Sequence, residues 1–211
     1  MSQNALSLKA QEICNIGPVI PVLVIENAND SKPLGDALLA GGVKVLEITL
    51  RTPAALDAIS ASAEIDGAVV GAGTVLTQTD LLNAKAAGAT FAVSPGANDD
   101  LIAAAIKEDF PLLPGAITPS EVMSLRAKGF HMLKFFPAEI AGGIKMIQAM
   151  GSVFSDVSFC PTGGISASNA RDYLAQKNIR CVGGSWLAPK DVVADQNWDE
   201  ITKIAKAASG L

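Results

Sequence analysis

Lys134 interrupts an apolar segment, Phe130–Phe136, that otherwise has the length and composition of a buried strand. An unpaired ammonium loses its solvation when it is buried, so such a site favours the neutral amine, and a neutral amine attacks carbonyl groups. The alternative is a lysine at a strand end whose stem packs along apolar surface while its ammonium reaches water. The segment by itself leaves both interpretations open.

A carboxylate is predicted to share the interior with this lysine. Side chains alternate along a strand, so Glu47 lies on the same face as Val45, whose small branched side chain suits a barrel interior. The same face carries Thr49 and Arg51. An inward carboxylate is costly unless it is paired, and Lys134 is its natural partner in charge. The alternative is a Glu47–Lys134 or Glu47–Arg51 ion pair that only fills the interior.

The rest of the chain alternates strands with helices. Ala/Leu/Ile-rich stretches with helical spacing lie between apolar runs of strand length. Such alternation implies parallel pairing, and eight units close most economically into a (β/α)8 barrel, near the short end of that fold's length range. The alternative is a doubly wound open sheet, but the first run is followed by no GxGxxG fingerprint. The predicted strands are Pro18–Val24, Val43–Thr49, Ala68–Ala72, Thr90–Ser94, Pro111–Gly115, Phe130–Phe136, Val157–Pro161 and Ile179–Gly183.

The sequence also indicates where several helices begin and end. Thr118, Pro119 and Glu121 form the pattern of an N-cap, a proline at the first helical position and a capping-box glutamate. Thr52–Pro53 predicts another helix start, and glycines such as Gly88 predict helix ends just before strands.

Two glycine pairs follow the last two predicted strands. Gly163–Gly164 and Gly183–Gly184, the second followed by Ser185, lie where barrels commonly hold phosphate on exposed backbone amides. No lysine or arginine lies within either loop, so binding is expected to depend on amides and a hydroxyl. Two tight turns without a ligand are the alternative.

Composition excludes several classes of function. With 211 residues, 49% of them hydrophobic and 18% charged, we expect residues 1–211 to form one globular domain. The net charge of −5 comes without a basic run, so a nucleic-acid partner is not expected. The N-terminus lacks the order of a signal peptide and no apolar run is long enough to span a membrane, so a cytoplasmic protein without a membrane partner is predicted.

The cysteines and the single histidine bear on metal chemistry. Cys14, Cys160 and Cys181 form no CxxC pair, so buried free thiols are predicted. One histidine, His131, argues against a histidine-rich zinc site, and a structural role is the simpler interpretation of a histidine on an apolar strand. No metal or other cofactor is predicted.

The motifs VLEITLR, GAGTVL, SPG, KFFPAE, FCPTGGI and GGSWL, in this order across nearly the whole chain, resemble the bacterial 2-keto-3-deoxy-6-phosphogluconate (KDPG) aldolase family, whose members often also cleave 4-hydroxy-2-oxoglutarate (KHG). The resemblance implies a (β/α)8 barrel with an N-terminal helix, a homotrimer and a phosphorylated 2-keto acid as substrate, with pyruvate as a product. It makes Lys134 the Schiff-base lysine and Glu47 the general acid/base. It assigns the pyruvate end to Arg51, Thr74, Pro95, Phe136 and Thr162, and the phosphate to Gly163, Gly164, Gly184 and Ser185.

Two other functions are weighed against this one. The related 6-phosphogalactonate aldolases share the lysine and the glutamate but are less similar around Arg51, CPTGGI and GGSWL. A non-catalytic sugar-phosphate sensor would keep the glycine loops but would not need a buried lysine. The implied reaction needs no metal, because the iminium formed on the lysine supplies the polarisation that a zinc ion would otherwise provide.

Overall fold

The computed structural model describes residues 4–211, and within them parallel strands alternate with helices. Each of the eight predicted runs overlaps a strand; most strands are shorter than the runs, and β3 and β8 each end one residue beyond theirs. The strands are β1 (Val19–Leu23), β2 (Val45–Thr49), β3 (Val69–Gly73), β4 (Phe91–Val93), β5 (Leu112–Leu113), β6 (Met132–Phe135), β7 (Ser158–Pro161) and β8 (Val182–Gly184).

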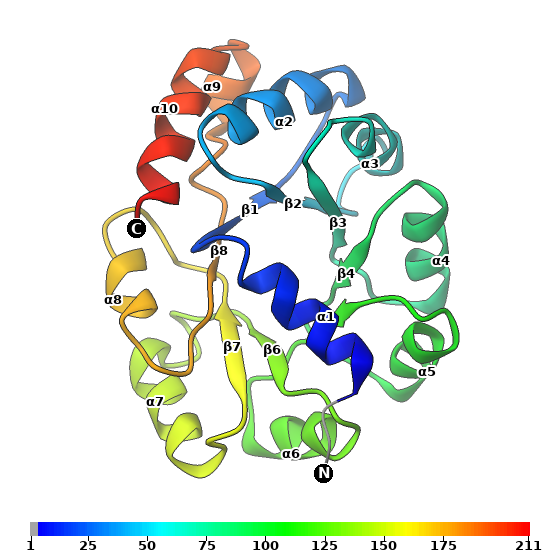
Figure 1. Cartoon of the computed structure of the whole chain (residues 1–211), viewed down its shortest axis with the longest axis vertical. Helices are drawn as coiled ribbons and strands as arrows, with labels where there is room; N and C mark the ends of the chain where they lie inside the picture. Colours follow the sequence, from blue (N-terminus) through cyan, green and yellow to red (C-terminus); the bar gives the residue numbers. More distant parts are fainter. Residues whose placement is uncertain (1–3) are drawn as a thin grey trace.

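The helices surround the strands when the molecule is viewed down its shortest axis (Figure 1). A short 3-10 helix, Ala28–Asp30, precedes α2. The helices are α1 (Ala5–Cys14), α2 (Ser31–Ala40), α3 (Ala55–Ala63), α4 (Gln78–Ala86), α5 (Asp99–Lys107), α6 (Pro119–Ala127), α7 (Gly143–Val153), α8 (Ala170–Leu174), α9 (Lys190–Ala194) and α10 (Trp198–Ser209).

The parallel sheet is curled into a half-barrel. Six strands of the described chain pair in the order β5-β4-β3-β2-β1-β8, and β6 pairs with β7 in a separate two-stranded sheet. Single parallel bridges connect the two sheets, at Gly115–Lys134 on one side and at Phe159–Ile179 and Thr162–Gly183 on the other. The first strand therefore lies beside the last, unlike the doubly wound alternative, whose strand order reverses at β1.

Alternate residues of the strands enter two separate hydrophobic clusters. Leu46 and Ile48 belong to the large cluster between the strands and the helices, whereas Val45 belongs to a smaller cluster on the concave face of the sheet. The predicted orientation of β2 is thereby confirmed, because Glu47 shares the face of Val45. The smaller cluster comprises Cys14, Ile20, Val45, Phe91, Val93, Leu113, Met132, Cys160 and Cys181.

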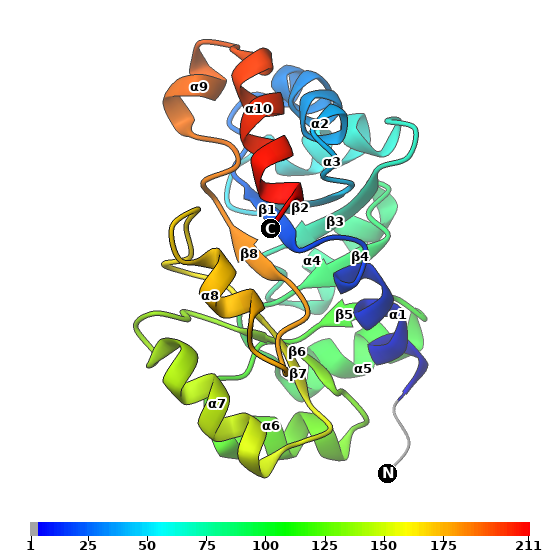
Figure 2. The ribbon, with the colours of Figure 1, turned by 60° about the vertical axis from the view of Figure 1, so that its left-hand side comes forward.

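Helix α1 lies across one end of the strands (Figures 1 and 2). The Ser7 hydroxyl oxygen accepts hydrogen bonds from the backbone N–H groups of His131 (2.9 Å) and Met132 (3.3 Å), at the start of β6. Cys14, the last residue of α1, joins the concave cluster. The helix thus covers the N-terminal ends of the strands, which leaves the C-terminal ends as the open side.

The predicted helix signals have mixed outcomes. Thr118 caps α6 in a complete capping box, and Gly88 follows α4 with a φ of +101°. The prediction at Thr52–Pro53 is wrong in position. Helix α3 begins at Ala55, and the Thr52 hydroxyl donates to the carbonyl of Ile25 (2.6 Å) instead of capping a helix.

Glu121 completes the capping box of α6. Partial burial acts to raise the pKa of its carboxyl group, but hydrogen bonds from the N–H groups of Ile117 and Thr118 and from the Thr118 hydroxyl outweigh this effect and lower the pKa. Because the folded-state pKa is below the unfolded one, the stabilisation is present above the unfolded value and is lost as the pH falls through the folded value.

We therefore expect Glu121→Gln to lower the free energy of unfolding by about 0.5 kcal/mol at neutral pH, at the low end for a helix cap. The difference from the unsubstituted protein should shrink as the pH falls below the ordinary glutamate value of 4.5. Urea unfolding at several pH values measures it. Ser120→Ala in the same turn is the control, and its effect should not vary with pH. A pH-independent effect of Glu121→Gln would contradict the assignment.

Candidate active site

A single cavity of about 490 Å3 collects every residue that the sequence analysis assigned to a site. These residues lie at or just after the C-terminal ends of β2, β3, β4, β6, β7 and β8. The sequence therefore predicted the placement correctly, because the ends of parallel strands meet at one edge of a curled sheet. The predicted residues in the cavity wall are Glu47, Arg51, Thr74, Pro95, Lys134, Phe136, Thr162, Gly163, Gly164, Gly184 and Ser185.

Lys134 and Glu47 form a buried ion pair at the base of this cavity. Nζ of Lys134 lies 3.1 Å from Oε1 of Glu47, and their side chains are only 7% and 4% exposed. The Lys134–Glu47 pairing expected from charge is therefore present, whereas an unpaired lysine, a lysine whose ammonium reaches water and a Glu47–Arg51 pair are not. The pairing offsets the desolvation of both charges. It also makes Glu47 the nearest group that can accept a proton from the ammonium and release the nucleophilic amine.

The carboxylate occupies space that a missing side chain leaves free. A Cβ atom built on Gly73 of β3 would lie 2.8 Å from Cγ of Glu47 and would clash with its carboxylate. Glycine at this position therefore allows Glu47 to extend toward β6 and reach Lys134. On the other side, the Phe136 ring centroid lies 5.8 Å from Nζ of Lys134, so the ammonium also faces the ring's electron density.

Free thiols lie beneath the pair. Cys160 of β7 is the register partner of Lys134, and it belongs to the concave cluster with Cys14 and Cys181. All three are free and buried, as predicted. A hydrogen bond with Cys160, together with burial, raises the pKa of the Cys14 thiol, and hydrogen bonds with both neighbouring thiols, together with burial, raise that of Cys181, so these two stay neutral.

Arg51 is held at the cavity wall by a neutral partner. Its Nε donates to Oγ1 of Thr49 (3.1 Å), and the Thr49 hydroxyl donates to the carbonyl of Leu23 (2.8 Å). Within residues 4–211 no carboxylate lies within ion-pair distance of its guanidinium. The fork of N–H donors is therefore available for an anionic ligand, for which a planar carboxylate is a good match. Thr49 thus positions Arg51, a role the sequence analysis did not assign.

Two threonines in the wall show further signs of a binding site. Thr74 has a φ of +60°, in the left-handed region that costs a non-glycine residue about 1 kcal/mol or more. Oγ1 of Thr162 is buried and makes no hydrogen bond to any described residue. Backbone strain and orphaned polar atoms are features that a bound ligand can use.

The glycine loop after β7 is tied to the strand that carries the lysine. The N–H groups of Ala138 and Glu139 donate to the carbonyls of Thr162 (2.8 Å) and Gly163 (3.1 Å). The Glu139 carboxylate accepts a hydrogen bond from the Tyr173 hydroxyl of α8, and burial together with this bond raises the pKa of Tyr173. These contacts fix Gly163 and Gly164, with φ of +99° and +79°, relative to Lys134.

The structure adds wall residues that the sequence analysis missed. Lys190, the first residue of α9, contributes a third cation to the cavity. It could have been found by considering the helix after the last glycine loop, because βα connections cover the mouth of a barrel. The other additional residues are Val22, Val24, Thr49 and Ile165, and Gly183 of the predicted glycine pair also lines the cavity.

His131 has a structural environment, as the sequence analysis favoured. It precedes β6 at the end covered by α1, and its Nδ1 lies 3.2 Å from a carboxylate oxygen of Asp156. It does not line the cavity of Lys134. Among the described residues, no three His, Cys, Asp or Glu side chains are grouped so that they could hold a metal ion. In residues 4–211, no helix is both long and apolar enough to cross a bilayer.

Comparisons with known proteins agree on one family. The family model of KDPG and KHG aldolases matches residues 10–204. The KHG/KDPG aldolase of Escherichia coli K12 is 50% identical over 200 residues, covering 94% of each chain.

Solved structures of the same family are close as well. The KDPG aldolase of Legionella pneumophila, with pyruvate captured as a covalent carbinolamine, superposes with a TM-score of 0.93 at 44% identity, covering 95% of this chain and 98% of that one. The Zymomonas mobilis ZM4 enzyme with 3-phosphoglycerate gives a TM-score of 0.89 at 48% identity, covering 95% and 94%.

The close approach of Gly73 and Glu47 gives a prediction for this site. Gly73→Ala should push the carboxylate away from Lys134 and lower kcat for carbonyl-substrate turnover by about 10²-fold, the typical cost of a misplacement near 1 Å. The matched control is Gly96→Ala, because a Cβ atom at Gly96 meets nothing within 4 Å. Steady-state kinetics measure kcat for both variants, and urea unfolding shows whether either variant is partly unfolded under the assay conditions. Equal kcat values for the two variants would contradict the positioning role of Gly73.

Proposed function

The chain belongs to the KDPG and KHG aldolase family, and we propose that it cleaves 2-dehydro-3-deoxy-6-phosphogluconate to pyruvate and glyceraldehyde 3-phosphate through a Schiff base on Lys134. It is an aldolase, a carbon–carbon lyase, so the non-catalytic sensor is not supported. The observation that carries the proposed mechanism is the buried Lys134–Glu47 pair, 3.1 Å apart, at the base of the cavity.

The polar groups of the cavity define two ends for an extended substrate. Arg51, Thr74 and Thr162 are assigned to the keto-acid end, with the guanidinium gripping the carboxylate in a fork-like pair. Gly163 and Gly164 after β7, Gly184 at the end of β8 and the Ser185 hydroxyl are assigned to the phosphate. Binding at both ends would hold the C2 ketone against Lys134 and the C4 hydroxyl toward Glu47.

Catalysis begins with a proton transfer within the buried pair. When the Lys134 ammonium gives a proton to Glu47, its neutral amine can attack the C2 ketone and form a carbinolamine. Glu47 then gives this proton to the carbinolamine hydroxyl, which leaves as water, so that the iminium forms and the Glu47 carboxylate is restored. The positive nitrogen of this iminium is the electron sink for the next step.

Cleavage uses Glu47 as a base, acting directly or through one water. The carboxylate accepts the proton of the C4 hydroxyl, the C3–C4 bond breaks, and its electron pair moves to the iminium to give an enamine. Glyceraldehyde 3-phosphate leaves. The enamine is protonated at C3, and hydrolysis of the resulting iminium releases pyruvate and restores the Lys134 amine.

The same steps apply to 4-hydroxy-2-oxoglutarate, which would yield pyruvate and glyoxylate. This substrate keeps the 2-keto acid end and the C4 hydroxyl but has no phosphate. It would therefore use Arg51, Lys134 and Glu47 in the same way and leave the glycine loops unfilled. The double name of the Escherichia coli relative supports this second activity.

Single-turnover kinetics of two variants test the proposed roles. Lys134→Arg should abolish cleavage, because a guanidinium stays protonated and cannot form an imine. Glu47→Gln should still form the imine but slow cleavage by roughly 10²- to 10⁴-fold, the usual effect of a positioned acid/base group. Lys177→Arg, an exposed lysine outside the cavity, is the control. Retained cleavage by Lys134→Arg, or an unchanged cleavage rate for Glu47→Gln, would overturn the mechanism.

Barrel closure, subunit assembly and cellular location are proposed as well. We infer that residues 1–211 form one domain in which all eight strands close into a single barrel, supported by the bridges at Gly115–Lys134 and Thr162–Gly183. Hydrogen-exchange protection of the β5–β6 and β7–β8 backbone amides would test closure. We also propose a homotrimer, which rests on the family resemblance alone, and a cytoplasmic location, which rests on the sequence prediction. Light scattering should give the mass of three chains, and the mass of one chain would contradict it.

A further inference from the structure

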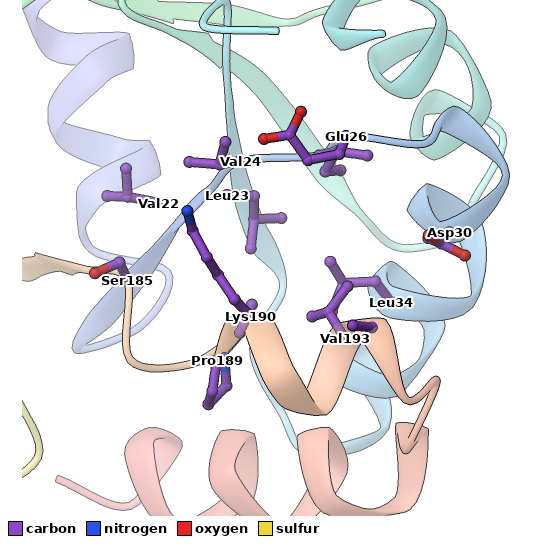
Figure 3. Close-up of a pocket in the computed structure, with 13 residues that line it drawn as sticks. Val22, Leu23, Val24, Glu26, Asp30, Leu34, Ser185, Pro189, Lys190 and Val193 are labelled. Carbon is purple, nitrogen blue, oxygen red and sulfur yellow. The ribbon is translucent and has the colours of Figure 1, made fainter.

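Lys190 lies in a wall that two cavities share. It lines the catalytic cavity and also a neighbouring cavity of about 550 Å3, and both are bordered by Val22, Val24 and Ser185. Figure 3 shows its side chain running from the start of α9 toward Val24, the residue after β1. The ammonium is therefore placed at the mouth of the catalytic cavity, although its residue belongs to a helix beyond the strands.

This lysine is the cation of the cavity with the fewest interactions. Lys134 is paired with Glu47, and Arg51 donates to Thr49. Within the described residues, Lys190 has neither an ion pair nor a side-chain hydrogen bond. Carboxylates of Glu26 and Asp30 border the neighbouring cavity, but neither lies within 4 Å of the Lys190 ammonium.

The position of Lys190 matches one end of the proposed substrate. It follows the loop that begins at Gly184 and Ser185, and the Gly163–Gly164 loop lines the same cavity. Arg51, in contrast, follows β2 on the other side of β1. Backbone amides alone do not neutralise the two negative charges of a bound phosphate. A flexible ammonium at the rim of the cavity can supply the missing positive charge as a point charge.

We propose that Lys190 binds the phosphate of the substrate and sets the preference for the phosphorylated 2-keto acid over 4-hydroxy-2-oxoglutarate. This inference rests on the proposed function. The second carboxylate of 4-hydroxy-2-oxoglutarate is bonded directly to C4 and stays near Glu47, whereas the phosphate of the six-carbon substrate is carried on C6. An interaction at the rim therefore helps one substrate and not the other.

Lys190 also permits a cleaner test than the glycine loops do. A Cβ atom on Gly184 would clash with the Trp186 ring, so any substitution there disturbs packing as well as the phosphate. Lys190 is exposed, so replacing its ammonium leaves the interior unchanged. Lys190→Met keeps much of the side-chain volume without the charge, and Lys190→Arg keeps the charge.

The experiment is to measure kcat/KM for both substrates in each variant. Lys190→Met should lower kcat/KM for the phosphorylated substrate about 10-fold, the low end for a charge-assisted hydrogen bond, and leave that for 4-hydroxy-2-oxoglutarate within a factor of two. Lys190→Arg keeps the positive charge, so it should retain most of the unsubstituted protein's ratio of kcat/KM for the phosphorylated substrate to kcat/KM for 4-hydroxy-2-oxoglutarate. Lys177→Met, an exposed lysine outside both cavities, is the matched control and should not change it.

Added salt gives an independent measurement. Raising the ionic strength should raise KM for the phosphorylated substrate in the unsubstituted protein and less so in Lys190→Met, because screening weakens an exposed charge pair. An unchanged ratio in Lys190→Met, or equal losses on both substrates, would overturn the role of Lys190. That outcome would leave the proposed function standing if the unsubstituted protein cleaves both substrates, whereas cleavage of neither would refute the proposed function itself.

Discussion

Lys134 and Glu47 come from strands that belong to different sheets, β6 and β2, yet their side chains meet in the interior at 3.1 Å. Either charge alone would be strongly destabilising at this depth, so each strand needs the other in place. Their meeting also requires a glycine at position 73, because any Cβ there would occupy the space of the carboxylate. The curvature of the sheets brings β2 and β6 close enough for the pair to form, and the glycine on β3 leaves room for its carboxylate.

The surroundings of the pair divide into an apolar floor and a polar rim. The thiols and aliphatic side chains of the concave cluster exclude water from below, and helix α1 covers the far end. Above the pair, the open strand ends carry Arg51, the strained Thr74 and the glycine loops. Proton transfer between Lys134 and Glu47 thus takes place where few water molecules can compete, while anionic groups of a ligand are bound nearer to solvent.

Much of this arrangement is readable from the sequence because it depends on local patterns. Period-two alternation in VLEITLR placed Glu47 and Val45 on one face, and the capping box at Thr118 located the start of α6. Contacts between distant segments are not encoded locally. The donation from Thr52 to Ile25, which replaces a helix cap, and the return of Lys190 to the cavity both depend on how βα connections fold over the mouth. The pairing of Lys134 was expected from charge balance, but its burial could be assessed only once β2 and β6 were placed together.

The central claim is that Lys134 forms the covalent intermediate, and a mass spectrum after borohydride reduction in the presence of pyruvate tests it most directly. Reduction converts an imine into a stable secondary amine, so the intact protein should gain the mass of one reduced pyruvate and peptide mapping should place the adduct on Lys134. An adduct on another lysine, or no adduct at saturating pyruvate, would contradict the account.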